Sequence, residues 1–148
     1  MASETDLVKL YSGRILALAA DIPHLGRLDA PTSTARARSP QCGSTVTVDL
    51  VVADHVITDF AQDVRACALG QASASVLGRE VIGKTRAEVA AARDALAAML
   101  TADAPPPAAP FDALEVLIPA REFVNRHASI LLAFDATLDA LDQAEDAA

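Results

Sequence analysis

Three side chains in this sequence have the chemistry to act together as soft metal ligands. Cys42 stands in a Pro-Gln-Cys-Gly segment, Cys67 stands where a strand pattern gives way to a helical one, and His127 lies near the start of the last predicted helix. Two thiolates and an imidazole suit zinc or an iron–sulfur cluster. Their spacing matches no local zinc motif, so the pattern leaves the metal open.

Each of these residues also has a simpler interpretation. Cys42 and Cys67 could be small buried hydrophobic side chains, and His127 could be a surface residue. A helix N-terminus, however, stabilises a thiolate and disfavours an imidazolium, which leaves a neutral ring nitrogen for a metal. A Cys67–His127 pair could also activate a nucleophilic thiolate, although the sequence indicates no oxyanion hole or substrate pocket.

Three strand patterns must position the two cysteines. They cover residues 32–39, 44–52 and 55–64, with Arg36 and Arg38 on one face of the first, polar edge strand. The links between them are short, with a tight turn at residues 53–54, and this predicts an antiparallel meander. Cys42 then lies in the turn between the first two strands, and Cys67 follows the third.

Helical patterns flank the strands. The first predicted helix covers residues 5–20, before a loop to about Pro31, and the others cover 67–79, 85–100, 111–117 and a segment from an N-cap near Asn125 past Leu141. Thr85 and Glu88 form a capping box, and Pro119 ends the short helix. We therefore predict an α+β fold in which about five helices pack on one face of a three-stranded antiparallel sheet.

Length and charge exclude several classes of protein. The chain has 148 residues, which predicts one domain over 1–148, with a core of about 5–142 and a frayed acidic tail over 143–148. Twelve basic against 20 acidic residues give a net charge of −8, which argues against nucleic acid and anionic membranes as partners. No apolar run is long enough to span a membrane, and the polar N-terminus does not resemble a signal peptide. We expect a cytoplasmic protein whose two cysteines are not a disulfide scaffold.

From Leu10 to Leu141 the chain resembles the iron–sulfur cluster scaffold proteins of the NifU N-terminal, IscU and SufU type. The matching segments are Ser39-Pro-Gln-Cys-Gly-Ser44, Ala66 to Ser75, Gly83-Lys-Thr85 and Ile118-Pro-Ala-Arg121. In the family, a Pro-x-Cys-Gly-Asp turn opens the second strand and a Gly-Cys-x-x-x-x-Ala-Ser-x-Ser segment opens a helix. The resemblance implies the SufE/NifU-like α+β fold and a site built from three cysteines and one aspartate.

This sequence departs from the family at two ligand positions. Ser44 replaces the aspartate, and matching His127-Ala-Ser129 to the family's His-Cys-Ser places Ala128 where the third cysteine belongs. The implied ligands are therefore Cys42, Cys67 and His127, with the fourth position filled by Ser44, a water, a small thiol or a second protomer. The family aspartate keeps the cluster labile, so Ser44 implies a more retentive site or none. Arg121 and Arg126 could offset the charge of a thiolate-bound cluster.

The resemblance implies a scaffold or carrier, not an enzyme. It would bind iron or a transient cluster and pass it to recipient apo-proteins. The expected cluster type is [2Fe–2S]. Its sulfur would come from a cysteine desulfurase, although the family's sulfur-accepting third cysteine is absent. A homodimer could bridge one cluster with four thiolates. Two alternatives are a non-catalytic binding or regulatory protein that has lost cluster assembly, and a zinc-binding sulfur-transfer protein.

Overall fold

The sheet is an antiparallel meander that determines where the cysteine-bearing segments lie. The computed structural model describes residues 12–41 and 43–146, so residues 5–11 of the first predicted helix, and Cys42 itself, lie outside the described part. The strands are β1 (Ser33–Arg38), β2 (Thr45–Ala53) and β3 (Val56–Arg65), in the order β1-β2-β3. All three predicted strands are confirmed.

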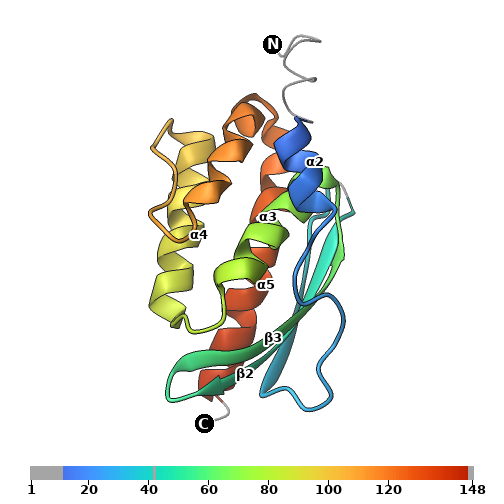
Figure 1. Ribbon diagram of the computed structural model, residues 1–148, viewed down its shortest axis with the longest axis vertical. Coiled ribbons are helices and arrows are strands. Elements are labelled where there is room, and N and C mark those ends of the chain that lie inside the picture. Colours follow the sequence, from blue (N-terminus) through green and yellow to red (C-terminus); the bar gives the residue numbers. More distant parts are fainter. Residues whose placement is uncertain (1–11, 42, 147–148) are drawn as a thin grey trace.

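The helices cover one face of this sheet, and the predicted α+β class is confirmed (Figure 1). They are α2 (Gly13–Ala19), α3 (Ala68–Glu80), α4 (Arg86–Thr101) and α5 (His127–Asp146), with 3-10 helices η1 (Asp112–Glu122) and η2 (Val124–Arg126) before α5. Helix α5 packs on β1 and β2, and α3 and α4 pack in turn on α5. Figure 1 shows α5 (red) along the long axis, with α4 (yellow) on one side and the strands on the other.

Alternation along β2 explains why the sheet has one covered face. Val46, Val48 and Leu50 are buried against the helices. A strand turns successive side chains to opposite faces, so the residues between them point the other way. No helix of the described residues is both long and apolar enough to cross a membrane.

One turn and three helix boundaries differ from the sequence predictions. The tight turn lies at Asp54 and His55 rather than at residues 53–54, because both of its residues have positive φ, 52° and 65°. Pro119 lies inside η1 instead of ending a helix, since a 3-10 helix survives the loss of one i→i+3 bond. Asn125 lies within η2, and α5 begins only at His127. Residues 143–146 are helical rather than frayed, because buried Ala144 holds the last turn on the core.

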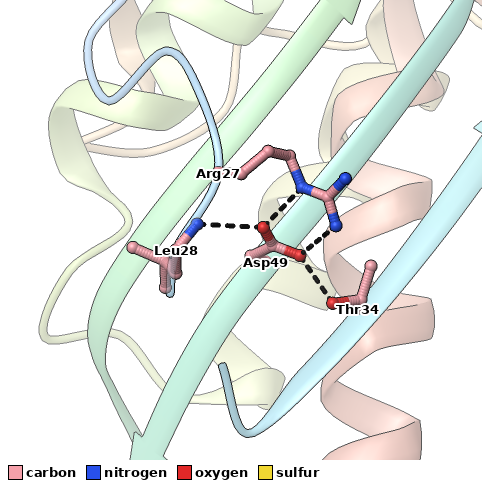
Figure 2. A network of polar contacts seen from close by, with 4 residues as sticks. All are labelled: Arg27, Leu28, Thr34 and Asp49. Carbon is pink, nitrogen blue, oxygen red and sulfur yellow. Dashed lines mark hydrogen bonds and ion pairs between the residues drawn. The ribbon is translucent and has the colours of Figure 1, made fainter. Parts of the chain in front are cut away.

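A buried carboxylate anchors the loop that follows α2 to the face of the sheet opposite the described helices, which we call the uncovered face. Asp49 of β2 accepts hydrogen bonds from Arg27 Nε at 2.6 Å and Nη2 at 3.0 Å, from the Leu28 amide at 3.0 Å and from Thr34 Oγ1. Figure 2 shows these four residues on β2, β1 and the loop. Burial would raise the pKa of Asp49, but the hydrogen bonds from Arg27, Thr34 and Leu28 and the Arg27 charge outweigh it, and the pKa is lowered. The sequence alone predicts no role for Asp49.

Candidate functional site

The Cys67 thiol lies at the N-terminus of α3, as predicted. Cys67 is the N-cap residue, its carbonyl accepts the first helical bond from the Gln71 amide at 2.9 Å, and its side chain makes no capping bond. The free, half-buried thiol instead lies with Sγ 3.6 Å from Ser129 Oγ of α5. Two helix starts therefore meet at this sulfur.

Ser129 connects Cys67 to the beginning of β2. Its Oγ lies 3.0 Å from Ser44 Oγ, and both hydroxyls are buried. Either oxygen can be the donor, so the pair can orient a proton toward the sulfur or away from it. Three segments converge here: the residue before β2, the N-cap of α3 and the first turn of α5.

The loop that contains Cys42 closes beside this convergence. The Ser39 amide donates to the Ser44 carbonyl at 2.8 Å, and the Gly43 amide donates to the Ser39 carbonyl at 2.8 Å. Gly43 has φ of +70°, a conformation that favours glycine. The loop therefore ends at Ser44, the residue that contacts Ser129. Cys42 itself lies outside the described residues, and its role as a ligand stays a prediction.

His127 has a partner of its own. The ring is buried, and Nε2 lies 2.9 Å from the Ala120 carbonyl oxygen. A carbonyl can only accept, so Nε2 carries the proton and Nδ1 is the nitrogen that remains available in the neutral ring. Over residues 12–41 and 43–146, no three histidine, cysteine or acidic side chains gather as a metal site. The assignment of His127 as a ligand stays a prediction.

The two departures from the family motif lie in different surroundings. Ser44 is buried against Ser129, whereas Ala128 is exposed on the first turn of α5. Arg121 is engaged elsewhere: Nε donates to the Met99 carbonyl at 2.7 Å, and Nη2 donates to the Ala104 carbonyl at 2.9 Å. It therefore holds the proline-rich loop to the end of α4. Arg126 is half-buried and has no acidic partner among the residues that the structure describes.

Gly70 allows α3 to approach α5 closely enough for the Cys67–Ser129 contact. A Cβ at position 70 would lie 2.7 Å from Ser129 Oγ, 3.0 Å from the Ser129 carbonyl oxygen and 2.9 Å from Ala66 Cβ. Real Cβ atoms essentially never lie under 3.0 Å from such neighbours, so a side chain here must displace Ser129 and Ala66 and disturb the packing of α3 on α5.

Gly70→Ala is therefore expected to lower the free energy of unfolding by about 1–3 kcal/mol, measured by urea denaturation. Alanine is intrinsically more favourable than glycine in a helix by about 1 kcal/mol. A decrease in the free energy of unfolding would therefore show that the added Cβ clashes. Gly13→Ala at the start of α2 is the matched control, because its Cβ would meet nothing within 4 Å. Equal stability of the two variants would contradict a tight α3–α5 contact.

Ser129 belongs to the family-like segment His127-Ala-Ser129, but the sequence alone predicts no role for it. The sequence feature that could have indicated a role is the position of Ser129, two residues after His127, where α5 begins. A side chain there faces either solvent or the neighbouring helix. Only the packing of α3 on α5 decides between these orientations. The contact between residues 62 positions apart in sequence carries no local signature.

Comparisons with known proteins agree on one family. The family described as NifU-like N terminal domain matches residues 10–115. The crystal structure of a nitrogen-fixing NifU-like protein (N-terminal) from Brucella abortus is 46% identical, covers 97% of this chain and 99% of that chain, and has a TM-score of 0.93. A candidate iron–sulfur cluster assembly scaffold of the SUF system from Fervidobacterium islandicum, 20% identical over 89% of this chain and 96% of that one, shares the fold with a TM-score of 0.80.

A curated relative matches over a shorter stretch. The iron–sulfur cluster assembly scaffold protein IscU of Thermotoga maritima is 32% identical over 80 residues, which are 54% of this chain. The match covers 56% of that relative, so the chain spans little more than half of its length.

Proposed function

This chain belongs to the NifU-like N terminal domain family, and we propose that it is a scaffold or carrier whose cargo is iron or an iron–sulfur cluster. The names of the Thermotoga maritima and Fervidobacterium islandicum proteins support this function. Cys67 and Cys42 would hold the cargo as thiolates. The proposal makes the chain a binding protein rather than an enzyme.

The observation that carries the proposal is the free Cys67 thiol at the N-terminus of α3. Amide groups at a helix N-terminus favour a negative charge, and a thiolate is the form that binds iron. The thiol is half-buried, so it is reachable but shielded on one side by Ser129. A ligand that must accept cargo and later release it needs this partial access.

The position of the loop over residues 39–44 supports Cys42 as the second ligand. Cys42 belongs to that loop, whose last residue contacts Ser129, so we place it as the second thiolate. His127 would offer Nδ1 as a third ligand, with a fourth from Ser44, a water, a small thiol or a second protomer. A [2Fe–2S] cluster bridging two chains would have four thiolates.

The proposal implies partners of two kinds. A cysteine desulfurase would supply sulfur, and apo-proteins would receive the cluster. We place the exchange in a reducing compartment, the cytoplasm, where thiols stay reduced.

The direct test is reconstitution of anaerobically purified protein with iron and sulfide. We expect a visible chromophore with bound iron and sulfide, and we expect its absence in a Cys42→Ser/Cys67→Ser variant. A colourless, metal-free wild type after reconstitution would overturn the proposal. Stoichiometric zinc without sulfide, lost in the double variant, would instead support the zinc-binding sulfur-transfer alternative.

One observation favours a second candidate, a binding or regulatory protein that no longer assembles clusters. Ala128 is exposed where the family resemblance places the third, sulfur-accepting cysteine. For this candidate, replacing both cysteines would leave binding to a desulfurase unchanged. The same double variant therefore separates the two functions.

A further inference from the structure

The uncovered face of the sheet carries a strip of arginines. Register places Arg38, Thr45 and Arg65 in one row across the three strands, and Arg36, Thr47 and Asp63 in the next. These positions alternate with residues buried against the helices, so their side chains lie on the opposite face. Arg36, Arg38 and Arg65, which we call the arginine strip, are all exposed.

These arginines form fewer ion pairs with acidic side chains than most other arginines of this chain. Six arginines have an acidic partner from another part of the structure within 4 Å: Arg14, Arg27, Arg79, Arg86, Arg93 and Arg121. In the described part of the chain, Arg36 and Arg38 have no such partner, and Arg65 has only its strand neighbour Asp63 at 3.7 Å. The strip therefore keeps a local positive potential on a chain of net charge −8.

The strip adjoins the candidate site. The row of Arg38, Thr45 and Arg65 is the last paired row at this end of the sheet. Arg38 precedes Ser39, which closes the loop that contains Cys42, and Arg65 lies two residues before Cys67. Neighbouring strands are about 4.8 Å apart, so the two outer arginines of the row are separated by roughly 10 Å. A protein surface that covers this row would therefore lie at the end of the sheet from which the chain continues to Cys67.

Resting on the proposed function, we propose that the arginine strip is the docking surface for the protein that supplies sulfur to this site. The partner would present carboxylates, which arginine binds through paired, charge-assisted hydrogen bonds. Nucleic acid offers phosphates instead, but it is a uniform polyanion, so a chain of net charge −8 repels it more strongly than a protein that carries carboxylates only in one local patch. Sulfur must be delivered close to Cys67 to enter a cluster held there, and a strip at the same end of the sheet would orient the donor for that delivery.

The test is the affinity for the source organism's cysteine desulfurase, measured by calorimetry. Arg36→Glu/Arg38→Glu is expected to weaken binding at least about tenfold at about 0.1 M salt. At about 1 M salt the difference is expected to shrink, because the screening length falls to about 3 Å. Arg14→Glu/Arg79→Glu is the matched control: it changes the net charge equally, and both residues are exposed on helices, Arg14 on α2 and Arg79 on α3, rather than on the sheet. Its affinity is expected to stay within about twofold of wild type.

Three results would overturn the docking surface. The first is equal affinity of the two double variants for the desulfurase, and the second is absence of binding by the wild type. The third is a wild-type dimer that the Arg36→Glu/Arg38→Glu variant no longer forms, because a second copy of the chain would then occupy the strip. Thermal unfolding of both variants verifies the fold. Chemical reconstitution needs no protein partner, so the two tests are independent. If the chain binds a cluster but its affinity for the desulfurase does not depend on the arginine strip, only the docking surface is overturned. If the affinity for the desulfurase depends on the arginine strip but reconstitution gives no cluster, only the proposed function is overturned.

Discussion

Replacing Cys67 with serine is expected to lower the iron and sulfide retained after reconstitution at least about tenfold, since even outer-shell partners of a metal are worth about that much. A serine hydroxyl holds its proton far more tightly than a thiol and is a poor iron ligand. The fold should not suffer, because serine is among the best N-cap residues and the Cys67 side chain makes no capping bond. Iron and sulfide analysis beside thermal unfolding checks both parts.

Thr85→Ser is the matched control for this experiment. It exchanges the N-cap residue of α4 for another good N-cap and leaves the α3 and α5 helix starts untouched. Its iron and sulfide content should equal that of the wild type. A Cys67→Ser protein that keeps the full content would show that the cargo is held elsewhere, even if the proposed function is right.

Asp49→Asn is expected to lower the free energy of unfolding at neutral pH by about 2–4 kcal/mol. The carboxylate is fully buried and accepts from Arg27, Thr34 and the Leu28 amide. An asparagine would turn an N–H₂ group toward one of these donors and remove the ion pair between Arg27 and Asp49. Urea denaturation measures the loss.

The size of this loss should depend on pH. The folded pKa of Asp49 is lowered from its usual 3.8, so its carboxylate stabilises the fold at every pH above that value. The contribution is lost as the pH falls through the lower folded pKa. The stabilities of wild type and Asp49→Asn should therefore begin to converge only as the pH falls below about 4.

Asp29→Asn removes a carboxylate from the exposed part of the same loop and serves as the control. We expect a change of no more than about 0.5 kcal/mol. If Asp49→Asn were equally mild, the anchoring of the loop would have to lie in its backbone contacts with β3.

Local chemistry explains which parts of the fold are readable from sequence. The three strands, the capping box at Thr85 and the helix start at Cys67 each depend on residues a few positions apart, and all are confirmed. The ends near Pro119 and Asn125 were wrong, because two 3-10 helices replace the predicted α-helical boundaries. Their short-range bonds leave little periodic pattern.

The candidate site was only partly readable for a different reason. Cysteine, histidine and the family-like motif marked the segments around Cys67, but the partner of the thiol is Ser129, and the partner of His127 is a backbone carbonyl. Asp49 stood out only as one acid in an apolar strand, and its principal partner lies 22 positions away. Such contacts exist only once helices and loop are packed on the sheet.

The pairing of the loop after α2 with β3 has a consequence for solubility at high concentration. Leu25 forms a parallel bridge with Gln62, the Gln62 amide donates to the His24 carbonyl at 2.9 Å, and the Gly26 amide donates to the Gln62 carbonyl at 2.9 Å. The outer edge of β3 thus already has backbone partners at its middle. A strand from another molecule would have to displace them before it could extend the sheet, so the fold resists edge-to-edge aggregation on this side.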